Sequence, residues 1–221
     1  FLILVENCSS SFAIAAANAI SDRLCMITGQ NVRLSPQHFL SCQEDAEGNE
    51  CKGGSIASFL DFAKKKGVVD ENCFAYQGEE NVACPSTIEQ CQKYFINDYC
   101  VANGVEGIKR EILKHGPVIA YIPVFRDFLV YKNGIYQVLE GTSRFQGGHA
   151  LKVVGWGQNE AGQEYWIVEN SWGEDWGIKG YAHIAIGQHQ MYLDDYAFAP
   201  TPKYEKEETT AKETTTAGGK L

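Results

Sequence analysis

Three polar side chains, far apart in the sequence, have the types and the order expected of a nucleophilic hydrolase. Ser11 begins an alanine-rich segment, His149 follows two glycines, and Asn170 precedes the tripeptide Ser-Trp-Gly. A hydroxyl group can attack a carbonyl carbon when an imidazole accepts its proton and a third side chain orients the imidazole ring. Ser11, His149 and Asn170 are therefore the candidate nucleophile, general base and orienting residue.

The candidate nucleophile lies in the half of the chain where helices are predicted. Ser11 to Met26 is small and apolar on most of its faces, which is typical of a buried helix. Apolar residues spaced three and four apart, with serine or proline at the starts and glycine at the ends, predict three more helices. These comprise residues 37–42 after the cap Ser35-Pro36, residues 55–66 and residues 105–114.

The candidate base and its orienting residue lie in the second half, where strands are predicted. Short aromatic or β-branched runs are separated there by Gly, Asn and Asp turns. The runs are residues 118–124, 134–138, 150–156, 164–168 and 180–186. Helices followed by strands indicate an α+β fold with two lobes.

The domain organisation follows from the same division. We expect one domain over residues 1–202, with a mainly helical, disulfide-rich lobe (1–104) and a mainly β lobe (105–202). Residues 203–221 are rich in Thr, Glu and Lys and contain few large apolar residues. That composition predicts a disordered tail.

Composition and charge exclude several classes of protein. The chain has 221 residues, of which 44% are hydrophobic, and this is sufficient for a core. A net charge of −9 argues against nucleic acid as a partner, because a phosphate backbone requires a basic surface. No apolar run approaches the roughly 20 residues that span a bilayer. Phe1–Val5 lacks the features of a signal peptide, and we expect the chain to begin inside a longer precursor.

Eight cysteines all lie in the first half of the chain. An even number among Gly- and Pro-containing loops is typical of a disulfide set formed in an oxidising compartment. A zinc site is the alternative, but the paired Cys-x-x-Cys or His spacings that zinc requires are absent. We expect no metal and no other cofactor. The cysteines are at positions 8, 25, 42, 51, 73, 84, 91 and 100.

Several short blocks of sequence lie in a fixed order around the candidate residues. They are Ala19–Cys25, Leu34–Gln37, Cys51–Gly54, His115–Val118, Phe128–Tyr136, Gly148–Ala150 and Asn170–Gly177. In this order they resemble the papain-like cysteine peptidases, in particular the cathepsin B and cathepsin X/Z branch. The resemblance extends from Cys8 to about Pro202. It implies a papain-like fold, with a helical lobe and an antiparallel β-barrel-like lobe on either side of a cleft.

The resemblance also implies roles for residues around the cleft. Ser11 stands at the nucleophile position, and Trp172 would shield the contact between base and orienting residue from water. Gly53 and Gly54 would present their backbone to an extended peptide. The compartment implied is the secretory pathway, a lysosome-like organelle or the extracellular space.

Cys8 could itself be the nucleophile if the helix began earlier. The resemblance instead matches Cys8 to a structural cysteine that bonds Cys51. Cys8 also lies three residues before the helix start at Ser11, whereas attacking thiols of low pKa lie at the helix N-terminus itself. We therefore assign Cys8 to a disulfide.

The resemblance implies further disulfide partners. Cys42 could pair with Cys84 or with Cys91. The partner of Cys25 would lie upstream of the first residue of this chain.

The residue at position 11 departs from the family's chemistry. A helix N-terminus and a neighbouring imidazolium lower the pKa of such a cysteine to roughly 3–4, so that a thiolate is present at rest. A serine hydroxyl must instead lose its proton during attack. Three further positions depart from the pattern: Val5 replaces an oxyanion-binding Gln, Ser9 replaces a Gly, and Phe12 replaces a Trp. Losing one oxyanion donor costs about 100- to 1,000-fold in rate.

We therefore predict a cathepsin B-like, papain-family protein that is proteolytically inactive and acts as a binding or structural component for a peptide or protein partner. The alternative is a weak peptidase or esterase that uses Ser11, His149 and Asn170. A simpler interpretation of Ser9-Ser10-Ser11 is a helix cap. The cathepsin B branch trims C-terminal dipeptides by means of a His-bearing occluding loop. Residues 73–100 contain no His, so this trimming is not expected.

Overall fold

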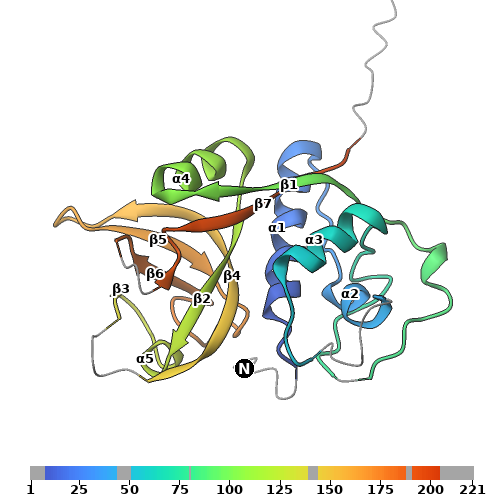
Figure 1. The fold of residues 1–221 in the computed structure, drawn as a ribbon, viewed down its shortest axis with the longest axis horizontal. Helices are drawn as coiled ribbons and strands as arrows, with labels where there is room; N and C mark the ends of the chain where they lie inside the picture. Colours follow the sequence, from blue (N-terminus) through green and yellow to red (C-terminus); the bar gives the residue numbers. More distant parts are fainter. Residues whose placement is uncertain (1–7, 44–50, 80, 139–143, 188–190, 205–221) are drawn as a thin grey trace, which may run out of the picture.

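The long helix α1 (Ser11–Thr28) stands between a group of helices and a twisted sheet, as Figure 1 shows. The structure is a computed structural model that describes residues 8–43, 51–79, 81–138, 144–187 and 191–204. Val5 and nearly all of the predicted tail, residues 203–221, lie outside the described residues. The buried face of α1 consists largely of alanines, which allow neighbouring elements to approach its backbone closely.

Two shorter helices and a core of aromatic rings complete the helical lobe. Helix α2 (Pro36–Cys42) begins at Ser35, whose hydroxyl accepts a hydrogen bond from the His38 N–H at 3.2 Å. Helix α3 (Ile56–Lys65) buries its apolar face on the same core. The rings of Phe12, Phe39, Phe59 and Phe62 pack together between the three helices.

The second lobe is built on a seven-stranded sheet. Its strands are β1 (Ile96–Asn103), β2 (Val118–Phe125), β3 (Ile135–Tyr136), β4 (Phe145–Gln158), β5 (Glu164–Glu169), β6 (Tyr181–Ala185) and β7 (Tyr196–Pro202). The spatial order is β1-β7-β2-β4-β5-β6-β3, and every pairing is antiparallel except β3 with β6. The remaining elements are α4 (Gly104–His115), α5 (Arg126–Leu129) and the 3₁₀ helix η1 (Ile88–Gln90).

The α+β fold class is confirmed, and the four predicted helices are present within two residues of their expected ends. The predicted strands are also present, although β4 begins earlier, at Phe145, and therefore includes His149. Two strands were not predicted. Strand β1 has mostly exposed side chains, and β7 contains Pro200 and Pro202, which weaken a strand pattern.

Arg23 ties α1 to the β lobe. Its side chain is 1% exposed, and its guanidinium donates to the carbonyl oxygens of Pro117 at 2.7 Å, Gly116 at 3.0 Å and Pro200 at 2.7 Å. It also forms an ion pair with Glu111 at 3.1 Å. Burial lowers the pKa of Arg23 although Glu111 opposes the shift, and the bonds satisfy the buried cation.

A second buried cation joins the same two lobes. The Lys152 ammonium, on β4, pairs with Asp22 of α1 and with Glu169 of β5, the latter at 2.9 Å. Arg23 and Lys152 therefore both connect the C-terminal half of α1 to the β lobe.

Three disulfides cross-link the helical lobe. Cys8 is bonded to Cys51, as the resemblance implies, Cys42 is bonded to Cys84 rather than Cys91, and Cys73 is bonded to Cys91. Cys25 and Cys100 carry free thiols. The predicted disulfide set therefore includes six of the eight cysteines, and neither Cys25 nor Cys100 has a bonding partner among the described residues.

Candidate active site

Ser11 is the first residue of α1, and its hydroxyl is directed across the lobe boundary. Ser11 Oγ accepts a hydrogen bond from the N–H of Ala150, on β4, at 3.2 Å. The N-cap residue is Ser10, whose side chain makes no capping bond but lies 2.5 Å from the Tyr76 hydroxyl. The interpretation of these serines as a helix cap therefore holds for the position of Ser10, although its side chain makes no capping hydrogen bond.

His149 and Asn170 are in contact. His149 Nε2 lies 2.7 Å from Asn170 Oδ1, and that oxygen also accepts the N–H of Ser171 at 2.8 Å. A backbone N–H can only donate, so the shared atom is the amide oxygen and His149 Nε2 must donate to it. The lone pair of the neutral imidazole is then on Nδ1.

Burial keeps the His149 ring neutral. The residue is 7% exposed, and burial lowers its pKa to about 4, against a smaller opposing effect of the hydrogen bond with Asn170. The ring of Trp172 lies 4.8 Å from the imidazole, centroid to centroid, and is itself 5% exposed. Asn170 Nδ2 is buried and has no hydrogen-bond partner among the described residues, so the amide is held through its oxygen.

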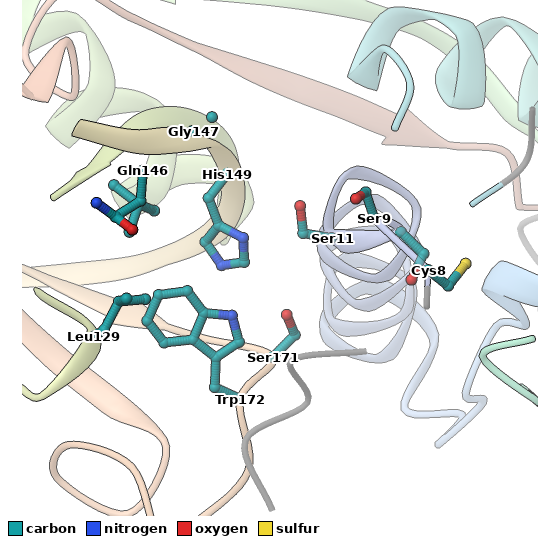
Figure 2. Close-up of a pocket in the computed structure, with 12 residues that line it drawn as sticks. Cys8, Ser9, Ser11, Leu129, Gln146, Gly147, His149, Ser171 and Trp172 are labelled. Carbon is teal, nitrogen blue, oxygen red and sulfur yellow. The ribbon is translucent and has the colours of Figure 1, made fainter. Parts of the chain in front are cut away.

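Ser11 and His149 face each other across a cavity. Figure 2 shows Ser11 at the start of α1 on one side, with His149 and Trp172 on the other. Within the described part of the chain, the Ser11 hydroxyl bonds Ala150 and makes no hydrogen bond with His149. The arrangement therefore presents an oriented, neutral base beside a hydroxyl that is not aligned with it.

Two cavities meet at this pair of residues. One, of about 330 Å³, is lined by Ser11 and His149 together with Leu129 and Trp172. The other, of about 580 Å³, is lined by Ser11 and His149 together with the Gly53-Gly54 loop of the helical lobe. An extended chain that crosses the site would pass from one cavity into the other.

The Gly53-Gly54 loop packs directly on the start of α1. A Cβ atom built on Gly54 would lie 2.4 Å from a ring carbon of Phe12, so this position requires glycine. Cys8 and Cys51 hold the loop in place through their disulfide. The loop, the helix start and the disulfide therefore form one unit on this side of the cleft.

Sequence reasoning missed several residues that line the larger cavity. These are Tyr121, Gln146, Tyr196 and Phe198. The one local signal was Tyr121, a tyrosine within an otherwise apolar predicted strand. Tyr196 and Phe198 were missed together with β7, which carries them.

Two general features of the described chain bear on the site. No group of three His, Cys, Asp or Glu side chains among the described residues is placed to hold a metal ion. No described helix combines the length and the apolar character needed to cross a membrane.

Comparisons with known proteins show which family the chain matches. Residues 5–201 match the sequence profile of the family described as Papain family cysteine protease. The chain is 34% identical over 223 residues to a gut-specific cysteine proteinase of Caenorhabditis elegans, a match that covers 89% of this chain and 67% of the relative. It is 30% identical over 221 residues to Cathepsin B-like protease 1 of Arabidopsis thaliana, which covers 91% of this chain and 58% of that protein.

A solved structure is similar over most of the chain. The structure of proCathepsin B S9 from Trypanosoma congolense has a TM-score of 0.81 and 33% sequence identity, and the match covers 89% of this chain and 70% of that one. This chain spans about three fifths to two thirds of the length of the two curated relatives named above.

Proposed function

This chain belongs to the papain family of cysteine proteases and is cathepsin B-like, and we propose that it binds a peptide or protein segment in its cleft without cleaving it. The observation that carries the proposal is the hydroxyl at the nucleophile position. Ser11 Oγ accepts the Ala150 N–H and makes no hydrogen bond with His149 among the described residues. The atom that would attack is therefore not engaged by the base.

The protonation state of His149 supports this proposal. A cysteine nucleophile of this kind is activated by forming a thiolate beside an imidazolium. His149 is instead neutral near pH 7, because burial lowers its pKa to about 4. A serine oxygen does not ionise beside it and must lose its proton during attack, which requires an alignment that Ser11 lacks.

A further loss concerns the developing negative charge. The family pattern places an amide side chain at position 5, and valine has no donor to offer. We infer a cost of about 100- to 1,000-fold in rate from this position alone. Phe12 adds a second change next to Ser11, where it packs against Gly54.

The binding surface is retained under this proposal. The cavities of about 330 Å³ and 580 Å³ on the two sides of Ser11 are large enough to receive side chains of an extended segment. We assign the binding domain to residues 1–202 and leave residues 203–221 outside it. Three disulfides fit a protein of the secretory pathway, a lysosome-like compartment or the extracellular space.

The second candidate function is a weak peptidase or esterase that uses Ser11, His149 and Asn170. The observation that favours it is the intact contact between His149 and Asn170 at 2.7 Å, which leaves the Nδ1 lone pair available as a base. The Ser11 hydroxyl would then have to leave Ala150 and align with the imidazole.

A hydrolysis assay separates the two functions. We expect the wild-type chain to cleave a fluorogenic peptide amide no faster than the Ser11→Ala and His149→Ala variants do. Turnover that both substitutions abolish, and that a thiol-directed epoxide leaves unchanged, would overturn the binding function and establish the serine enzyme.

A binding assay tests the cleft directly. Fluorescein-labelled alanine-rich pentapeptides are expected to bind the wild-type chain, with a rise in anisotropy. Ser11→Arg places a long side chain between the two cavities and should weaken binding at least tenfold. Ser58→Arg, at an exposed position of α3, is the matched control and should bind as the wild type does. Equal binding by both variants would place the peptide elsewhere.

A further inference from the structure

A third cavity lies further along α1 than the candidate nucleophile. Its volume is about 260 Å³, and Ser11 does not line it. Helix α1 contributes Ile14 and Asn18, which follow Ser11 by about one and two helical turns. The β lobe contributes Ser171 and Gly173, and Ser171 also borders the cavity of about 330 Å³. This third cavity is therefore close to the cleft but has walls of its own.

Two residues of opposite charge lie side by side in the wall of this cavity. The Glu71 N–H donates to the Arg33 carbonyl oxygen at 2.8 Å, next to the antiparallel bridge between Leu34 and Asp70. Directly opposed residues of such a pair project their side chains from the same face. Arg33 and Glu71 nonetheless form no ion pair with each other or with any other described residue. A cation and an anion are therefore both available to a ligand.

The remaining walls hold the carboxylate in place and provide apolar surface. Glu71 Oε2 accepts the N–H of Tyr76 at 3.0 Å, while Oε1 has no hydrogen-bond partner among the described residues. Ile14, Leu34 and Pro36 form an apolar wall, and the last two are buried. An apolar group that enters the cavity leaves water and packs against this wall, which favours its binding.

We propose that the third cavity binds a free apolar α-amino acid, whose carboxylate pairs with Arg33 and whose ammonium pairs with Glu71. The amino-acid side chain packs on the apolar wall. A guanidinium suits a carboxylate because its N–H groups can donate to both oxygens. A ligand with one charge would leave Arg33 or Glu71 without a partner. The volume lies just below the roughly 300–1,000 Å³ of most ligand pockets, which fits a small molecule. The inference does not rest on the peptide-binding function.

Isothermal titration calorimetry of the full chain tests the chemistry of the ligand. L-Leucine is expected to bind the wild-type chain at one site. Leucinamide lacks the carboxylate and N-acetyl-leucine lacks the ammonium, so each should bind at least tenfold more weakly than L-leucine. Glycine has both charges but no side chain, and it should also bind at least tenfold more weakly. Equal affinity of L-leucine and any one of these three compounds would overturn the proposal.

Three variants test the location of the site. Arg33→Gln and Glu71→Gln each remove one charge and should bind L-leucine at least tenfold more weakly than the wild type. Glutamine at position 71 keeps an oxygen that can accept the Tyr76 N–H, so the fold is retained. Arg110→Gln is the matched control, because Arg110 is exposed on α4 and does not line the cavity. It should bind L-leucine as the wild type does.

Two results would overturn the site. One is wild-type affinity for L-leucine in either Arg33→Gln or Glu71→Gln. The other is the absence of saturable binding of L-leucine to the wild-type chain at millimolar concentrations. The binding of the labelled pentapeptides, measured on the same preparations, reports on the cleft separately, so failure of one function is distinguished from failure of the other.

Discussion

Replacing Arg23 with methionine tests how firmly α1 is held against the sheet. The substitution removes the donors to three backbone carbonyls, those of Gly116, Pro117 and Pro200, and the cation beside Glu111. Each polar group left unsatisfied costs about 1–3 kcal/mol, and removing one partner of a buried ion pair costs about 3–5 kcal/mol. Methionine fills part of the same volume, which offsets some of the loss. We expect the free energy of unfolding to fall by about 3–5 kcal/mol.

Urea denaturation followed by tryptophan fluorescence measures this change. The free energy is obtained from the midpoint and the slope of the transition, with Arg33→Met as the matched control. Arg33 is exposed, so its replacement should change the free energy of unfolding by less than about 0.5 kcal/mol. A loss below about 1 kcal/mol for Arg23→Met, with an unchanged slope, would refute the reasoning that Arg23 couples the two lobes.

Three further predictions concern acid, disulfides and the nucleophile. Burial lowers the pKa values of His149 and His38 to about 4, so the unfolded chain binds more protons between about pH 4 and 6.5. The stability present above pH 6.5 is therefore lost as the pH falls toward 4. His149→Gln should reduce the change of the urea midpoint with pH, and the same change in variant and wild type would contradict this. Cys8→Ser should lower the free energy of unfolding by about 2–5 kcal/mol, whereas Cys100→Ser, at a free thiol, should leave it nearly unchanged. Ser11→Cys alone should give peptide hydrolysis well below that of active relatives, and full turnover would show that the other departures matter little.

The family and the α+β fold were predictable from the sequence because the signals were local and repeated. The helix at Ser11 is small and apolar on most of its faces, and the Gly-Gly-His and Asn-Ser-Trp-Gly blocks are short and specific. These predictions are confirmed by the family match and by the fold. The roles of Ser11, His149 and Asn170 stay predictions until the assays above are done.

The parts that sequence reasoning missed depend on contacts between distant residues. The bond from Ala150 to Ser11 joins positions 139 residues apart, and no local pattern indicates it. The position of Tyr121 over Gly148 depends on the register of β2 against β4, which a single sequence does not specify. Tyr196 and Phe198, which line the larger cavity, were missed because β7 has a weak strand pattern.

Strands β1 and β7 have a consequence for how a partner enters. In Figure 1 the two strands run together past α1 to the rest of the sheet, and β7 pairs with both β1 and β2. Together with Arg23 and Lys152, these two strands connect the two lobes at several places. Under the proposed peptide-binding function, a ligand that is held extended in advance should bind more tightly, because it loses less conformational entropy on binding.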